Sequence, residues 1–66
     1  MKLGKSIKIA LVQSEKNQQW LADRLGTTKQ QVSNWCSTGR MHDERIVEIS
    51  GIFGMKVSEF IALGED

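Results

Sequence analysis

The 66-residue sequence lacks proline and contains a single cysteine, Cys36. One cysteine excludes an intramolecular disulfide and a multi-cysteine zinc site, and it fits a reducing cytosol. The only histidine, His42, has no cysteine or histidine partner at a metal-ligand spacing. We therefore expect neither a metal nor a cofactor. Cys36 itself is interpreted as a half-buried small apolar residue.

Long apolar runs are also missing. No segment approaches the roughly 20 residues that a membrane-spanning helix needs. The N-terminal MKLGKSIKIALV lacks a small-residue cleavage site and soon turns polar. No repeat, low-complexity tract or linker divides the chain. We expect one domain over residues 1–66, with a thin core because so short a chain buries only about 60% of its unfolded surface. The expected location is the cytoplasm, away from any membrane.

The charges are unevenly distributed, although the net charge is only +1. Residues 1–42 hold seven Lys or Arg and two acids, giving +5, whereas residues 43–66 hold two Lys or Arg and six acids, giving −4. Such polarity is expected of a protein that binds a polyanion on one side, with ordinary surface charge as the alternative. Lys2, Lys5 and Lys8 share one flank at intervals of three. For Lys5 and Lys8 we favour a solvated face over phosphate contact.

Residues 18–37, QQWLADRLGTTKQQVSNWCS, have the pattern of two short helices joined by a tight turn. Gly26 is placed to end the first helix in the left-handed conformation, and Asn17 is a good N-cap for its start. Thr28 followed by Gln31 predicts a capping box for a second helix. The residues at helical spacing that would be buried are Leu21, Ala22, Leu25, Val32 and Trp35. The pattern therefore predicts helices over about residues 18–25 and 29–37.

The outward face of the second helix carries side chains that suit DNA. Lysine and carboxamide groups match guanine O6/N7 and adenine N6/N7, and hydroxyls bind bases or phosphates. The predicted base contacts are Lys29, Gln30, Ser33 and Asn34. A polar solvent-facing surface of a small helical bundle is the alternative. Gly39 is expected to end this helix, and Arg40, which follows it, is available to a phosphate.

A first helix is predicted over about residues 3–14. Leu3, Ile7, Ala10 and Leu11 form its apolar stripe. Ile9 and Val12 fall beside this stripe, and we expect them to widen the buried face, since helices in very small domains contact neighbours on two sides.

The second half of the chain predicts helices over about residues 43–53 and 57–63, ended by Gly54 and Gly64. Phe60 is the expected core anchor of the last helix. Gly51 within a helix suggests close approach of another segment. Apolar residues that cannot share the face of Phe60 leave a surplus of apolar surface near the C-terminus. These candidates for a dimer interface are Val57, Ile61 and Leu63.

The pattern Asn17-Gln18, Leu21-Ala22, Gly26, Val32, Trp35 and Gly39 resembles the Cro and phage-repressor helix-turn-helix family, also called the XRE family. The similarity continues through IVEISGIFGMKVSEFIAL, residues 46–63, and so covers roughly residues 7–64. It implies an all-α fold, a compact five-helix lambda-repressor-like domain. Two residues depart from the pattern: Cys36 replaces a common glutamate, and Lys16 replaces a common apolar residue.

The resemblance implies a sequence-specific transcriptional regulator, a Cro-like phage or prophage repressor without a small-molecule ligand. Its partner would be double-stranded operator DNA, read as a near-palindrome by a homodimer. In this family the start of the second helix abuts the DNA backbone, which gives Gln18 a role in phosphate binding. The predicted backbone contacts are Asn17, Gln18, Ser37, Thr38 and Arg40.

The sequence leaves two other functions as alternatives. An antitoxin or a regulator-binding modulator would use Trp20 and the acidic, partly apolar C-terminal half as a protein-binding surface. For Trp20 itself we favour packing over protein contact. An enzyme is the weakest alternative, because Cys36 and His42 are six residues apart across a predicted loop and no supporting catalytic group is evident.

Overall fold

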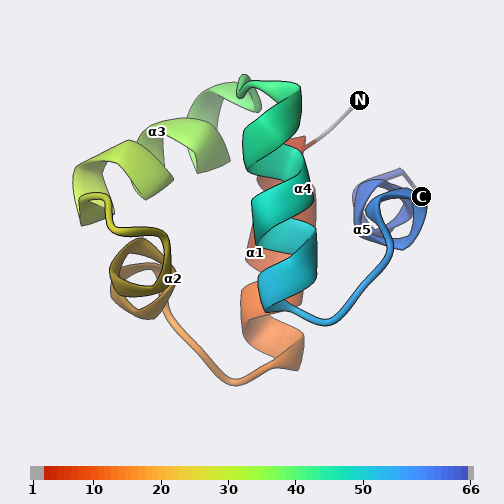
Figure 1. The fold of residues 1–66 in the computed structure, drawn as a ribbon, viewed down its shortest axis with the longest axis horizontal. Coiled ribbons are helices and arrows are strands. Elements are labelled where there is room, and N and C mark those ends of the chain that lie inside the picture. The colour runs from red at the N-terminus through yellow and green to blue at the C-terminus, as the bar shows by residue number, and fades with distance from the viewer. Residues whose placement is uncertain (1–2, 66) are drawn as a thin grey trace.

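The computed structural model describes residues 3–65, which form five α-helices and no strand (Figure 1). The helices are α1 (Leu3–Gln13), α2 (Gln18–Leu25), α3 (Lys29–Thr38), α4 (Asp43–Ile52) and α5 (Val57–Leu63). The predicted all-α, five-helix fold is confirmed. Predicted and observed helix ends differ by at most one residue. Lys2, expected on the lysine flank of the first helix, lies outside the described residues.

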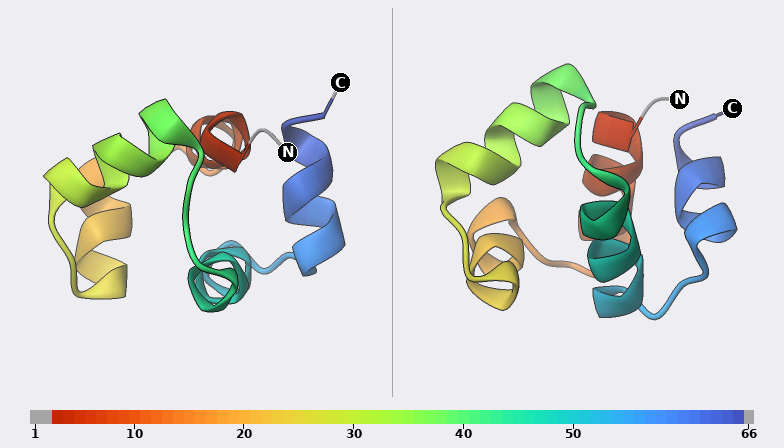
Figure 2. Two further views of the ribbon diagram at one scale, coloured as in Figure 1. Left: turned by 90° about the horizontal axis from the view of Figure 1, so that it is seen from above. Right: turned by 45° about the horizontal axis from the view of Figure 1, so that its top comes forward.

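α1 and α4 lie in the middle of the molecule on opposite sides of the core, with α4 in front of α1 in Figure 1, and with α2 and α3 to one side and α5 to the other (Figures 1 and 2). α5 packs against both α1 and α4, whereas α3 packs against α1 and α2. α2 also contacts α4. Among residues 3–65, no helix combines the length and the apolar character that crossing a membrane requires.

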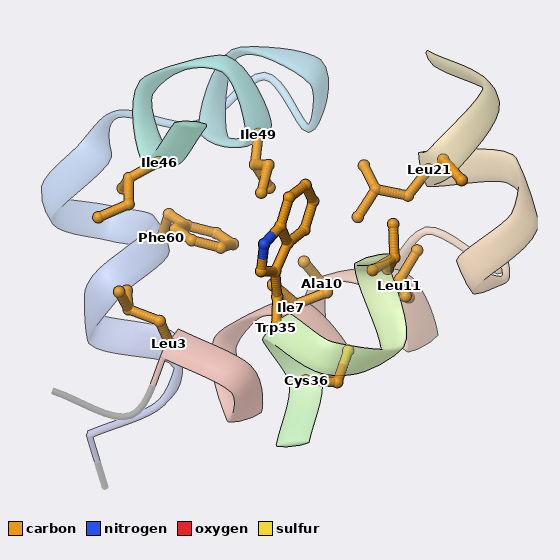
Figure 3. Close-up of a cluster of buried hydrophobic side chains, with 12 residues drawn as sticks. Leu3, Ile7, Ala10, Leu11, Leu21, Trp35, Cys36, Ile46, Ile49 and Phe60 are labelled. Carbon is orange, nitrogen blue, oxygen red and sulfur yellow. The ribbon is translucent and has the colours of Figure 1, made fainter. Parts of the chain in front are cut away.

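The core lies between these helices and has Trp35 at its centre. The Trp35 indole projects from α3 into the space bounded by Ile7 of α1, Ile49 of α4 and Phe60 of α5 (Figure 3). All four side chains are buried. The helix that carries the predicted base contacts is thus anchored in the core by a large aromatic side chain.

The stripe of α1 is narrower than expected. Leu3, Ile7 and Leu11 are buried as predicted, but Ile9 is only half-buried and Val12 is 77% exposed. The prediction that both would widen the buried face is wrong for Val12. α1 packs against α3 and α5, and the exposure of Val12 shows that neither helix covers it.

Close backbone approach occurs at Gly4 and not at Gly51. A Cβ atom added to Gly4 would lie 2.3 Å from the carbonyl oxygen of Cys36, whereas one added to Gly51 would meet nothing within 4 Å. The prediction for Gly51 is therefore wrong. Gly4 lets the first turn of α1 sit directly on the C-terminal half of α3, and this contact fixes how α3 is presented.

Candidate nucleic-acid interface

The start of α2 is fixed by local hydrogen bonds. The Oδ1 atom of Asn17 accepts a hydrogen bond from the Trp20 amide at 2.8 Å, which confirms the predicted N-cap. No acceptor within residues 3–65 takes the amide hydrogens of Gln18 and Gln19. These two amides stay available at the positive end of the helix dipole, where anions bind favourably.

The turn between α2 and α3 is built as the sequence predicts. Gly26 has φ 71°, and its amide donates to the carbonyls of Ala22 and Asp23. The Thr28 hydroxyl accepts from the Gln31 amide at 3.2 Å and caps α3. Only this half of the capping box forms within the described chain, since the Gln31 side chain makes no bond back to the Thr28 backbone there. Both helices are thus held by caps at the turn.

The outward face of α3 is polar and accessible. Val32, Trp35 and Cys36 bury the opposite face. The four predicted base-contacting residues lie away from the core: Lys29, Gln30 and Asn34 are exposed, and Ser33 is half-buried. The Gln30 Nε2 atom donates to Asn34 Oδ1 at 3.4 Å, so the two carboxamides lie one helical turn apart on the same strip of surface.

The predicted backbone-contacting residues lie at the start of α2 and at the C-terminal end of α3. Thr38 donates its hydroxyl hydrogen to the Asn34 carbonyl at 2.9 Å and accepts from the Arg40 amide at 3.2 Å. These bonds fix the exit loop, and Gly39 ends α3 with φ 68°. Arg40 is exposed beyond it. Gln18 is half-buried, and its Nε2 atom donates to Cys36 Sγ at 3.6 Å.

A basic hollow lies where the exit loop meets α4, and sequence reasoning missed most of it. Its cationic residues are Arg40 and Arg45, beside His42. The Arg45 guanidinium carbon lies 5.2 Å from the centre of the Trp35 ring, and one of its nitrogens lies 3.5 Å from Glu48. The hollow is lined by Gln31, Trp35, Arg40, Met41, His42 and Arg45. In the sequence, Arg45 belongs to the acidic half of the chain. The one sequence feature that indicates its contact with α3 is its position in the first turn of α4, directly after the exit loop.

A second hollow lies on the other side of α3, against α1. Lys5 and Lys8 line it together with Ser37 and Thr38, two of the predicted backbone contacts. The lysine flank therefore adjoins the exit of α3, and it is exposed as a solvated face would be. Burial raises the pKa of the Cys36 thiol in the same place, and the nearby Lys8 charge opposes that rise. Cys36 is buried more fully than expected, at 7% exposed.

Trp20 packs against the body of the molecule. Its ring lies 5.8 Å from that of Phe53, with 43° between the ring planes. Lys16 Nζ and the Arg24 guanidinium carbon lie 5.5 and 5.7 Å from the centre of the same ring. The favoured interpretation of Trp20 as a packing residue is thus confirmed, against Phe53 of the α4 C-cap. Lys16 stands where the resemblance to the phage-repressor family leads us to expect an apolar residue. It places a cation near the aromatic face of Trp20 instead.

No group of three or more metal-ligating side chains occurs within residues 3–65. His42 directly precedes α4, and its side chain makes no cap hydrogen bond. Cys36 and His42 are not brought together in either hollow, since each lines a different one.

Comparison with known proteins gives one result. A family model described as the bacteriophage CI repressor helix-turn-helix domain matches residues 7–66. No curated protein and no solved structure matches the chain. The matched range includes α2, the turn, α3 and all residues of the basic hollow, so the resemblance to phage repressors is confirmed.

Proposed function

Because the chain belongs to the bacteriophage CI repressor helix-turn-helix family, we propose that it is a sequence-specific repressor that reads operator DNA through α3. Family membership supports DNA binding and regulation of transcription. Beyond this, we propose a Cro-like phage or prophage repressor whose operator is a near-palindrome. The observation that carries the proposal is the exposed polar strip of Lys29, Gln30 and Asn34 on a helix anchored in the core.

Insertion of α3 into the major groove would place this strip against base edges. The major groove admits one α-helix, and lysine and carboxamide groups recognise guanine and adenine there. Each good bidentate pair contributes about 1 to 3 kcal/mol of discrimination. Because Gln30 and Asn34 lie one turn apart and hydrogen-bond to each other, we propose that they read neighbouring base pairs.

Phosphate contacts on both flanks of the groove would fix the register of α3. On the flank of Cys36, the start of α2 offers the amides of Gln18 and Gln19, which have no acceptor among residues 3–65. On the flank of Trp35, the exit loop offers Arg40 at the edge of the basic hollow. These groups bind phosphates without reading sequence, so they supply affinity and orientation.

A selection from randomised duplexes, followed by fluorescence anisotropy titration, tests this function. We expect recovery of one motif with two related halves, and binding to it at least about a thousandfold tighter than to a shuffled duplex of equal length. Equal affinity for both duplexes would contradict a sequence-specific repressor.

We also propose that the chain binds its operator as a homodimer, with half-sites about 34 Å apart. The support is apolar surface on α5. Val57, Ile61 and Leu63 touch the core cluster but stay only partly buried. A second copy packed on this helix would cover the remaining apolar area.

A further inference from the structure

The contact between Gln18 and Cys36 joins two parts of the interface that are 18 residues apart in the sequence. Gln18 is the first residue of α2, and Cys36 lies in the buried face of α3. The Gln18 Nε2 atom donates to Cys36 Sγ at 3.6 Å, within the range of a hydrogen bond to sulfur. The carboxamide is half-buried between the two helices.

In this arrangement one of the two Nε2 hydrogens of Gln18 remains available to another acceptor. A glutamine carboxamide nitrogen has two hydrogens, and a sulfur atom accepts only one of them, weakly. The second hydrogen has no acceptor among the described residues. It belongs to the same helix start as the amides of Gln18 and Gln19, which are also without acceptors in residues 3–65.

A tethered side chain loses less conformational freedom when it binds a ligand than a free one does. Glutamine is among the residues that lose most rotamer freedom on ordering. When a contact within the protein orders it beforehand, less of that loss falls on the binding step. The sulfur that tethers Gln18 is itself held in place, because Cys36 is buried in the C-terminal half of a core-anchored helix. Burial also raises the pKa of the thiol, which keeps it neutral beside a phosphate.

We propose that Cys36 is a positioning residue for DNA binding: its sulfur holds the Gln18 carboxamide so that the second amide hydrogen faces a backbone phosphate. This inference rests on the proposed function, because it assigns a partner to a group in the same interface. Cys36 itself does not contact DNA. Its role differs from that of a core filler, whose removal would lower stability without any dependence on Gln18.

A double-mutant cycle separates these two roles. The full chain, Gln18→Ala, Cys36→Ala and the double variant are titrated by anisotropy with the duplex selected above, at one salt concentration. We expect Gln18→Ala to weaken binding and Cys36→Ala to weaken it about two- to tenfold. In the Gln18→Ala background, Cys36→Ala should then have no further effect. Ile49→Val, a core change on α4, serves as the control and should leave affinity unchanged while the protein is folded.

A slope measurement distinguishes the loss of an uncharged contact from the loss of a cation–phosphate contact. Gln18 carries no charge, so its contact releases no counterion. Cys36→Ala should therefore lower affinity at every salt concentration and leave the slope of log K against log salt unchanged.

Nuclear magnetic relaxation of the side-chain amides tests the tether without any substitution. In the free protein, the Gln18 Nε2 group should be markedly more ordered than that of the exposed Gln13. Equal disorder at both positions would overturn the inference, even where Cys36→Ala folds poorly.

The remaining outcomes are distinct. If Cys36→Ala weakens binding equally with and without the Gln18 side chain, or does not weaken it, the inference fails and the proposed function stands. An unchanged affinity of Gln18→Ala has the same consequence. If the unaltered chain shows no preference for any duplex, the proposed function and the inference fail together.

Discussion

Among single residues, two helical glycines have opposite surroundings. Gly4→Ala should destabilise the fold by about 1 to 3 kcal/mol, because its Cβ would overlap the backbone carbonyl of Cys36. Gly51→Ala should stabilise it by roughly 0.5 to 1 kcal/mol, because its Cβ meets open space and alanine favours the helix. Urea unfolding of both variants checks the pair. A Gly4→Ala variant that is more stable than the unaltered chain would show that α1 and α3 are not in close contact.

Because of Cys36, the free energy of unfolding should fall at alkaline pH. Its thiol pKa is raised in the folded state by burial. A raised folded pKa contributes stability that is complete below the unfolded value, about 8.5, and is lost as pH rises through the folded pKa. Unfolding followed from pH 7 to about pH 10 should therefore show a fall in stability that Cys36→Ala lacks. At neutral pH, iodoacetamide should label the thiol much faster in urea than in the native protein. Rapid native labelling would contradict this burial.

At the scale of elements, the two-helix unit depends on its caps. Thr28→Ala should lower the free energy of unfolding by about 1 kcal/mol, because the Gln31 amide loses its acceptor. Gln31→Ala is the matched control, because Gln31 is the second residue of the predicted capping box. Its side chain makes no cap bond within the described chain, so we expect a change within about 0.5 kcal/mol. A larger loss for Gln31→Ala than for Thr28→Ala, measured by chemical denaturation, would reverse this assignment.

The helices and turns could be predicted because their determinants are local. Asn17, Gly26 and Thr28 each act within one helical turn, so their roles follow from sequence spacing alone. The errors concern contacts between elements. Which glycine faces another helix depends on how α1 crosses α3, and the sequence pattern gives no crossing geometry. For the same reason the stacking of Arg45 on Trp35 was not foreseen.

The outward face of the candidate site was also predictable, since helical periodicity places Gln30 and Asn34 opposite Val32. Helical periodicity does not predict which hydrogen-bond partner each side chain has. Gln18 was assigned to the DNA backbone from its position at a helix start. Its bond to Cys36 became visible only when α2 and α3 were placed together.

For the whole molecule, charge polarity should appear in the salt dependence of binding. The slope of log K against log salt falls by about 0.9 for each phosphate contact that a cation makes. Arg40→Ala should lower its magnitude by about 1, because Arg40 lies at the interface edge. Lys56→Ala is the control: it removes the same charge at the start of α5, in the acidic half. Equal effects of both variants would mean that attraction depends on net charge alone.

The proposed homodimer can be tested by changing one exposed apolar site and one on α5. Val57→Asp should dissociate the dimer, because it places a carboxylate in the apolar surface of α5. Val12→Asp is the control, since Val12 is 77% exposed on α1. Sedimentation velocity of both variants at several concentrations gives the masses. Dissociation by Val12→Asp alone would move the interface to α1.

The placement of Trp35 in the core has a consequence for divergence among operators. The side chains that pack α3 into the core, Val32, Trp35 and Cys36, are on one side of that helix, while Lys29, Gln30 and Asn34 are not among its buried residues. Substitutions at the latter three positions leave the core packing intact. Such a protein can acquire a new target sequence one side chain at a time, remaining folded at each step along the way.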